Sequence, residues 1–116
     1  MYDENNIFAK ILRKEIPCDK VHEDEFSLFF NDINPQAKIH VLGIPKFPCT
    51  TFSEFVKNAD NKNFTSFFKS VQLVINNLGI ENSGYRLITN SGENGGQEVP
   101  HFHIHILAGE KIGSLR

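Results

Sequence analysis

The segment VPHFHIHILAG, residues Val99–Gly109, has a histidine at every second position over its centre, with apolar side chains between. A β-strand points successive side chains to opposite faces, so the segment predicts a strand with its histidines on one face. Neighbours on that face lie roughly 7 Å apart along the strand. The histidine face would carry His101, His103 and His105, and the other face Phe102, Ile104 and Ile106. The apolar face therefore predicts a core, and the histidine face predicts a functional site.

Other segments have the residue types of strands and are separated by turn residues. Phe26–Asp32 and Ile39–Ile44 are rich in apolar residues, and Asn34-Pro35 supplies the turn between them. Tyr85–Asn90 predicts a further strand, and Val21–Glu23 a short edge strand beside the first. With the histidine segment, this gives about five strands, mostly in hairpin order.

Two segments have the periodicity of helices. Asn5–Lys14 is preceded by Asp3, a candidate cap, and Pro17 ends it. Asn61–Leu78 is longer, and Gly79 is a suitable residue to end it. Its apolar stripe consists of Phe64, Phe67, Phe68, Val71, Val74, Ile75 and Leu78. Two helices beside strands in hairpin order predict an α+β fold with an antiparallel sheet.

The length and charge of the chain limit the number of domains and the classes of partner that we expect. With 116 residues and no internal repeat or linker, residues 1–116 are expected to form one domain. A net charge of −2 argues against a nucleic-acid partner or a membrane surface, which favour basic patches. The first residues, MYDENNIFAK, lack the features of a signal peptide, and no apolar run could span a bilayer. We therefore expect a cytoplasmic protein.

The two cysteines, Cys18 and Cys49, do not point to a metal site. They form no CxxC motif and have no metal-type spacing with the histidines. A disulfide between them stays open at this stage, although the expected reducing compartment disfavours it.

A row of three histidines has three interpretations. A polar face turned to solvent is the simplest, but Glu, Lys and Thr are the usual residues there. A zinc site is the second, although three imidazoles in one line converge poorly on one ion, and we predict no metal. Nucleophilic catalysis on phosphorus is the third, because neutral imidazole is a good nucleophile near pH 7. The loop before the strand favours it, since Gly92–Gln97 is rich in glycines that let backbone N–H groups approach a phosphate.

Longer segments carry a resemblance to a known family. GGQEVPHFHIHILAG resembles the histidine triad motif. IFAKILRKEIP, FFNDINPQAKIHVLGIPK and GYRLITNSGENGGQ are similar, in order and spacing, to the histidine triad nucleotide-binding branch. The resemblance implies a five-stranded antiparallel sheet with two helices, joined to a second sheet across a homodimer. It also implies hydrolysis of purine nucleoside phosphoramidates, or similar adducts such as acyl-adenylates, without a cofactor.

The resemblance implies a role for each histidine of the motif. His103 would attack the α-phosphorus and form a nucleotidyl-histidine, which water hydrolyses to release a nucleoside monophosphate such as AMP. His105 would contact the phosphate and the leaving group, while His101 and His40 would support the nucleophile. Asn90 would lie near the phosphate, and Gly96 with Gln97 would form the phosphate-binding turn.

The resemblance also implies a nucleoside pocket. Asp32 would accept hydrogen bonds from the ribose hydroxyls, although an Asp before Asn34-Pro35 is equally typical of a turn. Glu98 stands where many relatives have serine; we expect its backbone N–H to serve the phosphate and its side chain to lie in solvent. The purine pocket would consist of Ile7, Phe8, Ile11, Phe30, Ile33 and Leu42, each of which could equally be core.

Two rival functions stay open. The same histidines could serve a dinucleoside-polyphosphate hydrolase, which differs in the leaving group. The chain could also be a nucleotide-binding or interaction module with little catalysis, although a competent residue occupies each position of the nucleophile site. The physiological substrate and its leaving amine do not follow from the sequence.

Overall fold

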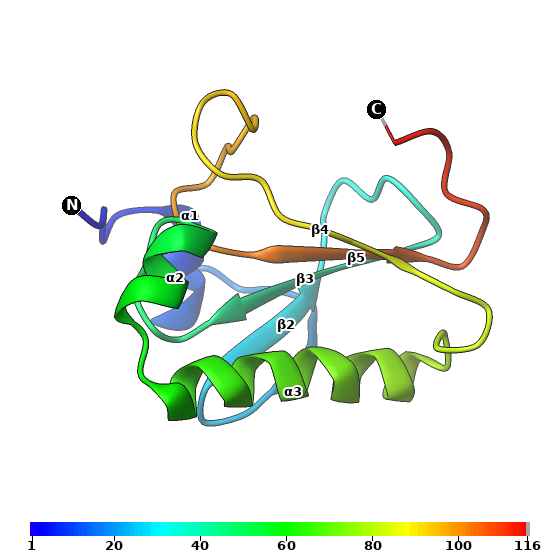
Figure 1. Ribbon diagram of the computed structural model, residues 1–116, viewed down its shortest axis with the longest axis horizontal. Coiled ribbons are helices and arrows are strands. Elements are labelled where there is room, and N and C mark those ends of the chain that lie inside the picture. The colour runs from blue at the N-terminus through cyan, green and yellow to red at the C-terminus, as the bar shows by residue number, and fades with distance from the viewer. Residues whose placement is uncertain (116) are drawn as a thin grey trace.

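The computed structural model describes residues 1–115 and has the predicted α+β architecture (Figure 1). Five strands form one antiparallel sheet in the order β1-β2-β3-β5-β4. Their bounds are β1 (Lys20–Glu23), β2 (Ser27–Asn31), β3 (Ile39–Pro45), β4 (Arg86–Ile88) and β5 (Ile104–Ala108). The helices are α1 (Ile7–Leu12), α2 (Phe52–Asn58) and α3 (Asn61–Leu78). No helix within residues 1–115 is long and apolar enough to cross a bilayer.

The two faces of the sheet bury two separate cores. Phe29 and Val41 point to the face that α3 covers, and α3 lies along that face in Figure 1. Their neighbours on β2 and β3 point to the opposite face, where they pack against Phe8 and Ile11 of α1. The second core consists of Phe8, Ile11, Leu28, Phe30, Leu42 and Ile44. The period of two along each strand thus places α1 and α3 on opposite sides of one sheet.

Phenylalanines dominate the core beneath α3. Phe29 stacks on Phe67 with ring centroids 6.1 Å apart, and Phe55 stacks on Phe102 at 5.1 Å. Phe29 also covers Gly43, its cross-strand partner on β3, where an added Cβ would collide with the ring. A glycine is required there because the aromatic ring occupies the space of a side chain.

Both ends of the first helix and the number of helices differ from expectation. α1 begins after Asn6, whose side chain accepts from the N–H of Ala9, so Asn6 is the cap rather than Asp3. Beyond the end of the helix, Lys14 adopts the left-handed region at φ 65°. Its N–H donates to the carbonyl of Ile11, and this bond closes the last turn. A third helix, α2, was not predicted, because its seven residues are too few to show a clear period.

The histidine strand is shorter than predicted. β5 begins at Ile104, so of the three histidines only His105 lies in the ladder with β3. Before it, the N–H of Phe102 donates instead to the carbonyl of Cys49, outside the sheet. His101 and His103 precede β5, so the prediction of a single strand carrying all three histidines was wrong, although Phe102, Ile104 and Ile106 do share one core.

The two cysteines are free thiols. Cys49 is buried, and burial raises the pKa of its thiol to about 12. Cys18 is half-buried in a separate part of the chain, and burial raises its pKa as well. The disulfide left open by the sequence is therefore not formed.

Asp24 joins the β1–β2 hairpin to α3. One carboxylate oxygen accepts from the N–H groups of Phe26 and Ser27, while the other accepts from the Ser70 hydroxyl at 2.5 Å and faces His22 Nε2 at 2.8 Å. Hydrogen bonds to Ser70 and His22 outweigh burial and lower the pKa of Asp24 to about 2. His22 of β1 thus belongs to this structural cluster.

We predict that Asp24→Asn lowers the free energy of unfolding at pH 7 by about 1–3 kcal/mol, because it weakens several hydrogen bonds at once. The depressed pKa of Asp24 means that its stabilisation is present above about pH 4 and is lost as the pH falls towards 2. Urea unfolding at pH 7 and pH 3 should therefore show a smaller difference in the variant than in the wild type. Glu25→Gln, an exposed neighbour, is the control; equal pH dependence in wild type and Asp24→Asn would contradict the assignment.

Candidate active site

A cavity of about 610 Å³ collects side chains from segments far apart in the chain. Phe8 comes from α1, Leu42 from β3, and His105 from β5. The loops after β2 and β4 supply most of the polar lining. The lining residues are Phe8, Asp32, Asn34, Gln36, His40, Leu42, Asn90, Gly96, Glu98, Val99, His103 and His105.

His103 is held in one tautomer. Its Nδ1 lies 2.7 Å from the backbone carbonyl of His101, and a carbonyl can only accept, so Nδ1 carries the proton. Burial lowers the pKa of His103, which favours the neutral ring. The edge of the ring packs against Phe8 at 4.9 Å between centroids. A neutral imidazole protonated on Nδ1 has its free lone pair on Nε2, which makes His103 a candidate nucleophile.

His101 lies behind this residue and outside the cavity lining. Its Nε2–H donates to the carbonyl of Pro45 at 2.8 Å, and its Nδ1 accepts from the Tyr2 hydroxyl at 2.6 Å. Burial lowers the pKa of His101 to about 4, so the ring is neutral. His101 therefore acts as a fixed support that ties the N-terminal segment to the end of β3.

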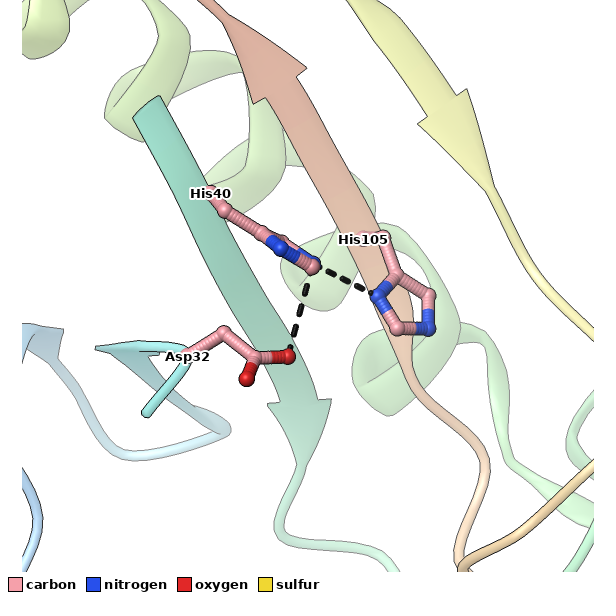
Figure 2. A group of neighbouring side chains, drawn as sticks. All are labelled: Asp32, His40 and His105. Carbon is pink, nitrogen blue, oxygen red and sulfur yellow. Dashed lines mark hydrogen bonds and ion pairs between the residues drawn. The ribbon is translucent and has the colours of Figure 1, made fainter. Parts of the chain in front are cut away.

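Asp32, His40 and His105 form a cluster on the cavity wall (Figure 2). The N–H of Gln36 donates to His40 Nδ1 at 3.0 Å, so the proton of neutral His40 is on Nε2. That Nε2–H donates to His105 Nδ1 at 2.9 Å and lies 3.4 Å from Asp32 Oδ2. Neutral His105 consequently has its own proton on Nε2, and burial lowers its pKa to about 4. The chain of donors ends in an N–H group on a side chain that lines the cavity.

The same three residues are the group best placed to hold a metal ion. One ligand atom from each lies within 4.8 Å of the others. An ion on His40 Nε2 would require the proton on Nδ1, where it would oppose the N–H of Gln36. The donor set therefore fits a hydrogen-bonded chain better than a metal site.

Asp32 forms the turn that its sequence context suggested, and its carboxylate also lines the cavity. Its Oδ1 accepts from the N–H of Asn34 at 2.8 Å, which forms the turn after β2. Its Oδ2 faces His40 within the cavity. The turn thus fixes the position of the carboxylate in the site.

The side chain of Gln97 organises the loop before β5 instead of lining the cavity. Its amide donates to the carbonyl of Thr50 at 2.6 Å and to that of Val99 at 3.0 Å. Its Oε1 accepts from the N–H of Gly92 at 3.0 Å. Gln97 therefore shapes the loop and ties it to the segment before α2.

The backbone donors of this loop differ from those expected at Gly96 and Gln97, but not at Glu98. The N–H groups of Gly96 and Gln97 donate to carbonyls earlier in the same loop. The hydrogen bonds within residues 1–115 give no acceptor to the N–H groups of Glu98 and Val99, and both residues line the cavity. These two amides are the better candidates to bind an anion. The Glu98 side chain is exposed at the cavity rim.

The cavity includes only part of the apolar set proposed for the purine. Phe8 and Leu42 line it, together with Val99, which the sequence did not single out. The others lie outside the lining: Ile7 is 45% exposed, Ile33 is 90% exposed, Phe30 belongs to the second core, and Ile11 lines a separate pocket beside Cys18. An apolar residue type alone does not distinguish a core position from a cavity wall.

The polar residues that the sequence analysis missed lie in the turn after Asp32. Asn34 and Gln36 line the cavity, and Gln36 orients His40 through its backbone. Only their nearness to Asp32 and His40 in the chain could have indicated them. Gln36 acts through its backbone N–H, which almost every residue type has.

Comparisons with protein-family models and with known proteins match this chain to one family. The HIT domain model matches residues 13–112. An uncharacterized HIT-like protein from Azospirillum brasilense is 46% identical over 114 residues, covering 98% of this chain and 93% of that protein. The purine nucleoside phosphoramidase of Escherichia coli K12 is 38% identical over 112 residues, covering 97% of this chain and 93% of that protein.

A solved structure has the same fold. The HIT family hydrolase from Legionella pneumophila Philadelphia 1 superposes with a TM-score of 0.86 at 38% identity. The match covers 94% of this chain and 96% of the other. The antiparallel sheet described above is therefore that of a solved relative.

We predict that long-range ¹H–¹⁵N spectra at pH 7 show His103 as the Nδ1–H tautomer and His40, His101 and His105 as Nε2–H tautomers. Because burial lowers their pKa values to about 4, His101 and His105 should stay neutral until the pH falls close to that value. A His103 ring protonated on Nε2, or titration of His101 at the ordinary pKa of histidine, would contradict this geometry.

Proposed function

The chain belongs to the HIT domain family, and from this premise we propose that it hydrolyses purine nucleoside phosphoramidates through a nucleotidyl-histidine intermediate. The observation that carries the proposal is the His103 Nδ1–H bond to the His101 carbonyl, which leaves a neutral Nε2 as nucleophile. The name of the Escherichia coli relative, purine nucleoside phosphoramidase, supports the substrate class. We propose that no metal or other cofactor takes part.

In the first step, His103 Nε2 attacks the α-phosphorus as the bond from phosphorus to the leaving nitrogen breaks. The departing amine needs a proton, and the Nε2–H of His105 is the donor that we assign to it. His105 recovers a proton through the Nε2–H of His40, which faces the Asp32 carboxylate, and solvent returns one proton to this pair so that both rings end the step neutral. The Nδ1–H bond to the His101 carbonyl stabilises the positive charge that develops on the attacking ring.

In the second step, water attacks the phosphorus from the side that the amine has left. The bond between phosphorus and His103 Nε2 breaks, and the electron pair returns to the ring as its lone pair. The proton lost by water passes to the same hydrogen-bonded chain and from it to solvent, which balances the proton that solvent supplied in the first step. The products are a nucleoside monophosphate and the neutral enzyme.

We assign the nucleotide to the cavity by chemical type. The Asp32 carboxylate, which can only accept, suits the two ribose hydroxyls. The free N–H groups of Glu98 and Val99 suit the phosphate oxygens. Asn90 also lines the cavity, and we assign its side chain to the phosphate. Phe8 and Leu42 offer an apolar surface for the base.

We also propose that two chains associate as a homodimer. β4 is the last strand of the sheet and leaves one edge without a partner strand. Leu87 on this strand is 43% exposed, Tyr85 before it 39%, and Leu73 on α3 43%. An unpaired edge beside exposed apolar residues supports pairing with a second copy. The free thiols support a reducing, cytoplasmic location.

For the nucleophile, we expect His103→Ala to lower kcat by about a thousandfold or more, while nucleotide affinity changes little. Single-turnover kinetics with an adenosine phosphoramidate and calorimetric titration with AMP would measure the two effects. Brief reaction of the wild type with labelled substrate should leave an acid-labile label on His103.

His22→Ala is the matched control, because His22 lies outside the cavity and bonds to Asp24. This variant should keep its turnover. Substantial turnover by His103→Ala, or a label on another residue, would exclude the proposed mechanism.

For the dimer, light scattering at micromolar concentration should give twice the 13.2 kDa of one chain. Leu87→Lys should shift the mass towards the monomer, because it places a charge on the proposed interface. Val56→Lys, which changes an equally exposed residue on α2, should leave the mass unchanged. A monomeric wild type at this concentration would refute the dimer.

A further inference from the structure

The charged groups of the cavity are all of one sign. Its lining includes two carboxylates, Asp32 and Glu98, and no lysine or arginine among residues 1–115. The histidines add no positive charge at neutral pH, because burial lowers the pKa values of His40, His103 and His105. A substrate therefore enters a cavity whose only fixed charges are negative.

The two carboxylates differ in what they contact. Asp32 accepts from the N–H of Asn34 and faces His40, so its position is fixed by the protein. Glu98 is exposed at the rim, and no described residue forms an ion pair or side-chain hydrogen bond with it. The loop that carries it, residues 91–99, contains a second glutamate and no basic residue. The charge of Glu98 is thus available to a ligand.

The position of Glu98 places this charge at the solvent side of the cavity. Phe8, Leu42 and Val99 form the apolar part, and Asp32 lies on the histidine wall. The group that leaves phosphorus must depart towards solvent, where Glu98 is exposed. A polyphosphate in that place would bring further negative charge towards a carboxylate that no lysine or arginine joins in the described cavity lining, which is unfavourable.

We infer that Glu98 selects substrates whose leaving amine carries a second, positively charged group. This inference rests on the proposed phosphoramidate activity and adds the class of leaving group. A cationic amine offsets both the Glu98 carboxylate and the charge of the phosphoramidate. For charges about 6 Å apart at a partly exposed site, the expected preference over a neutral amine is about three- to tenfold in kcat/KM.

The test compares three adenosine phosphoramidates with leaving amines of equal length: cadaverine, n-pentylamine and ε-aminohexanoate. Their far ends are cationic, neutral and anionic, while their reacting nitrogens are all primary alkyl amines. The wild type should prefer cadaverine over pentylamine and pentylamine over aminohexanoate. Added salt should shrink these ratios, because Glu98 is exposed and the interaction is screened.

Variants of Glu98 test whether this residue causes the preference among the three leaving amines. Glu98→Gln should bring the ratio of cadaverine to pentylamine close to one, and Glu98→Lys should reverse the order in favour of aminohexanoate. Glu93→Gln is the matched control, because Glu93 lies in the same exposed loop but does not line the cavity. Its ratio should equal that of the wild type.

The outcomes separate the two proposals. Turnover of all three compounds without a charge preference, or a preference that Glu98→Gln and Glu98→Lys leave intact, overturns the inference and keeps the phosphoramidate activity. Absence of turnover with every compound overturns the activity and the inference together. Loss of the preference in Glu93→Gln would also overturn the assignment to Glu98.

Discussion

The hydrogen bond from His103 Nδ1–H to the His101 carbonyl sets the chemistry of the cavity. The His101 carbonyl precedes the β-ladder, which begins at Ile104, and is available to accept this bond. His101 stays in place because Pro45 and Tyr2 satisfy both of its ring nitrogens. A buried imidazole without these partners would be costly, so they hold in place the carbonyl that fixes the proposed nucleophile, His103.

Burial determines the charge state of the other imidazoles. Removal from water favours neutral rings, and the surrounding donors and acceptors then decide which nitrogen carries the proton. The backbone N–H of Gln36 decides this for His40, and His40 decides it for His105. The result is a directed chain of hydrogen bonds beside Asp32, in a cavity whose fixed charges are negative. Because the histidines are neutral and the carboxylates are not, the cavity favours the positively charged leaving amine inferred from Glu98.

The sheet holds these groups in register because it is packed on both faces. Phe29 and Phe67 stack beneath it, and Phe8 packs above it against Phe30 and against the ring of His103. The histidine site therefore shares a wall with the second core. A change that loosens this core should move the ring of His103 as well as lower stability, since close-packed interiors transmit displacement.

Local sequence patterns predicted the long helix Asn61–Leu78 to the residue, the position of β3 and the antiparallel class of the sheet. These features depend on periodicity and on end residues such as Gly79, which are properties of contiguous residues. The tertiary structure alone decided which histidine faces which partner: the bond from Tyr2 to His101 joins residues 99 positions apart. It also excluded Ile33 from the cavity lining and brought Gln36 and Val99 into it. Such placements depend on distances across the fold and on backbone groups that every residue shares, so no local pattern encodes them.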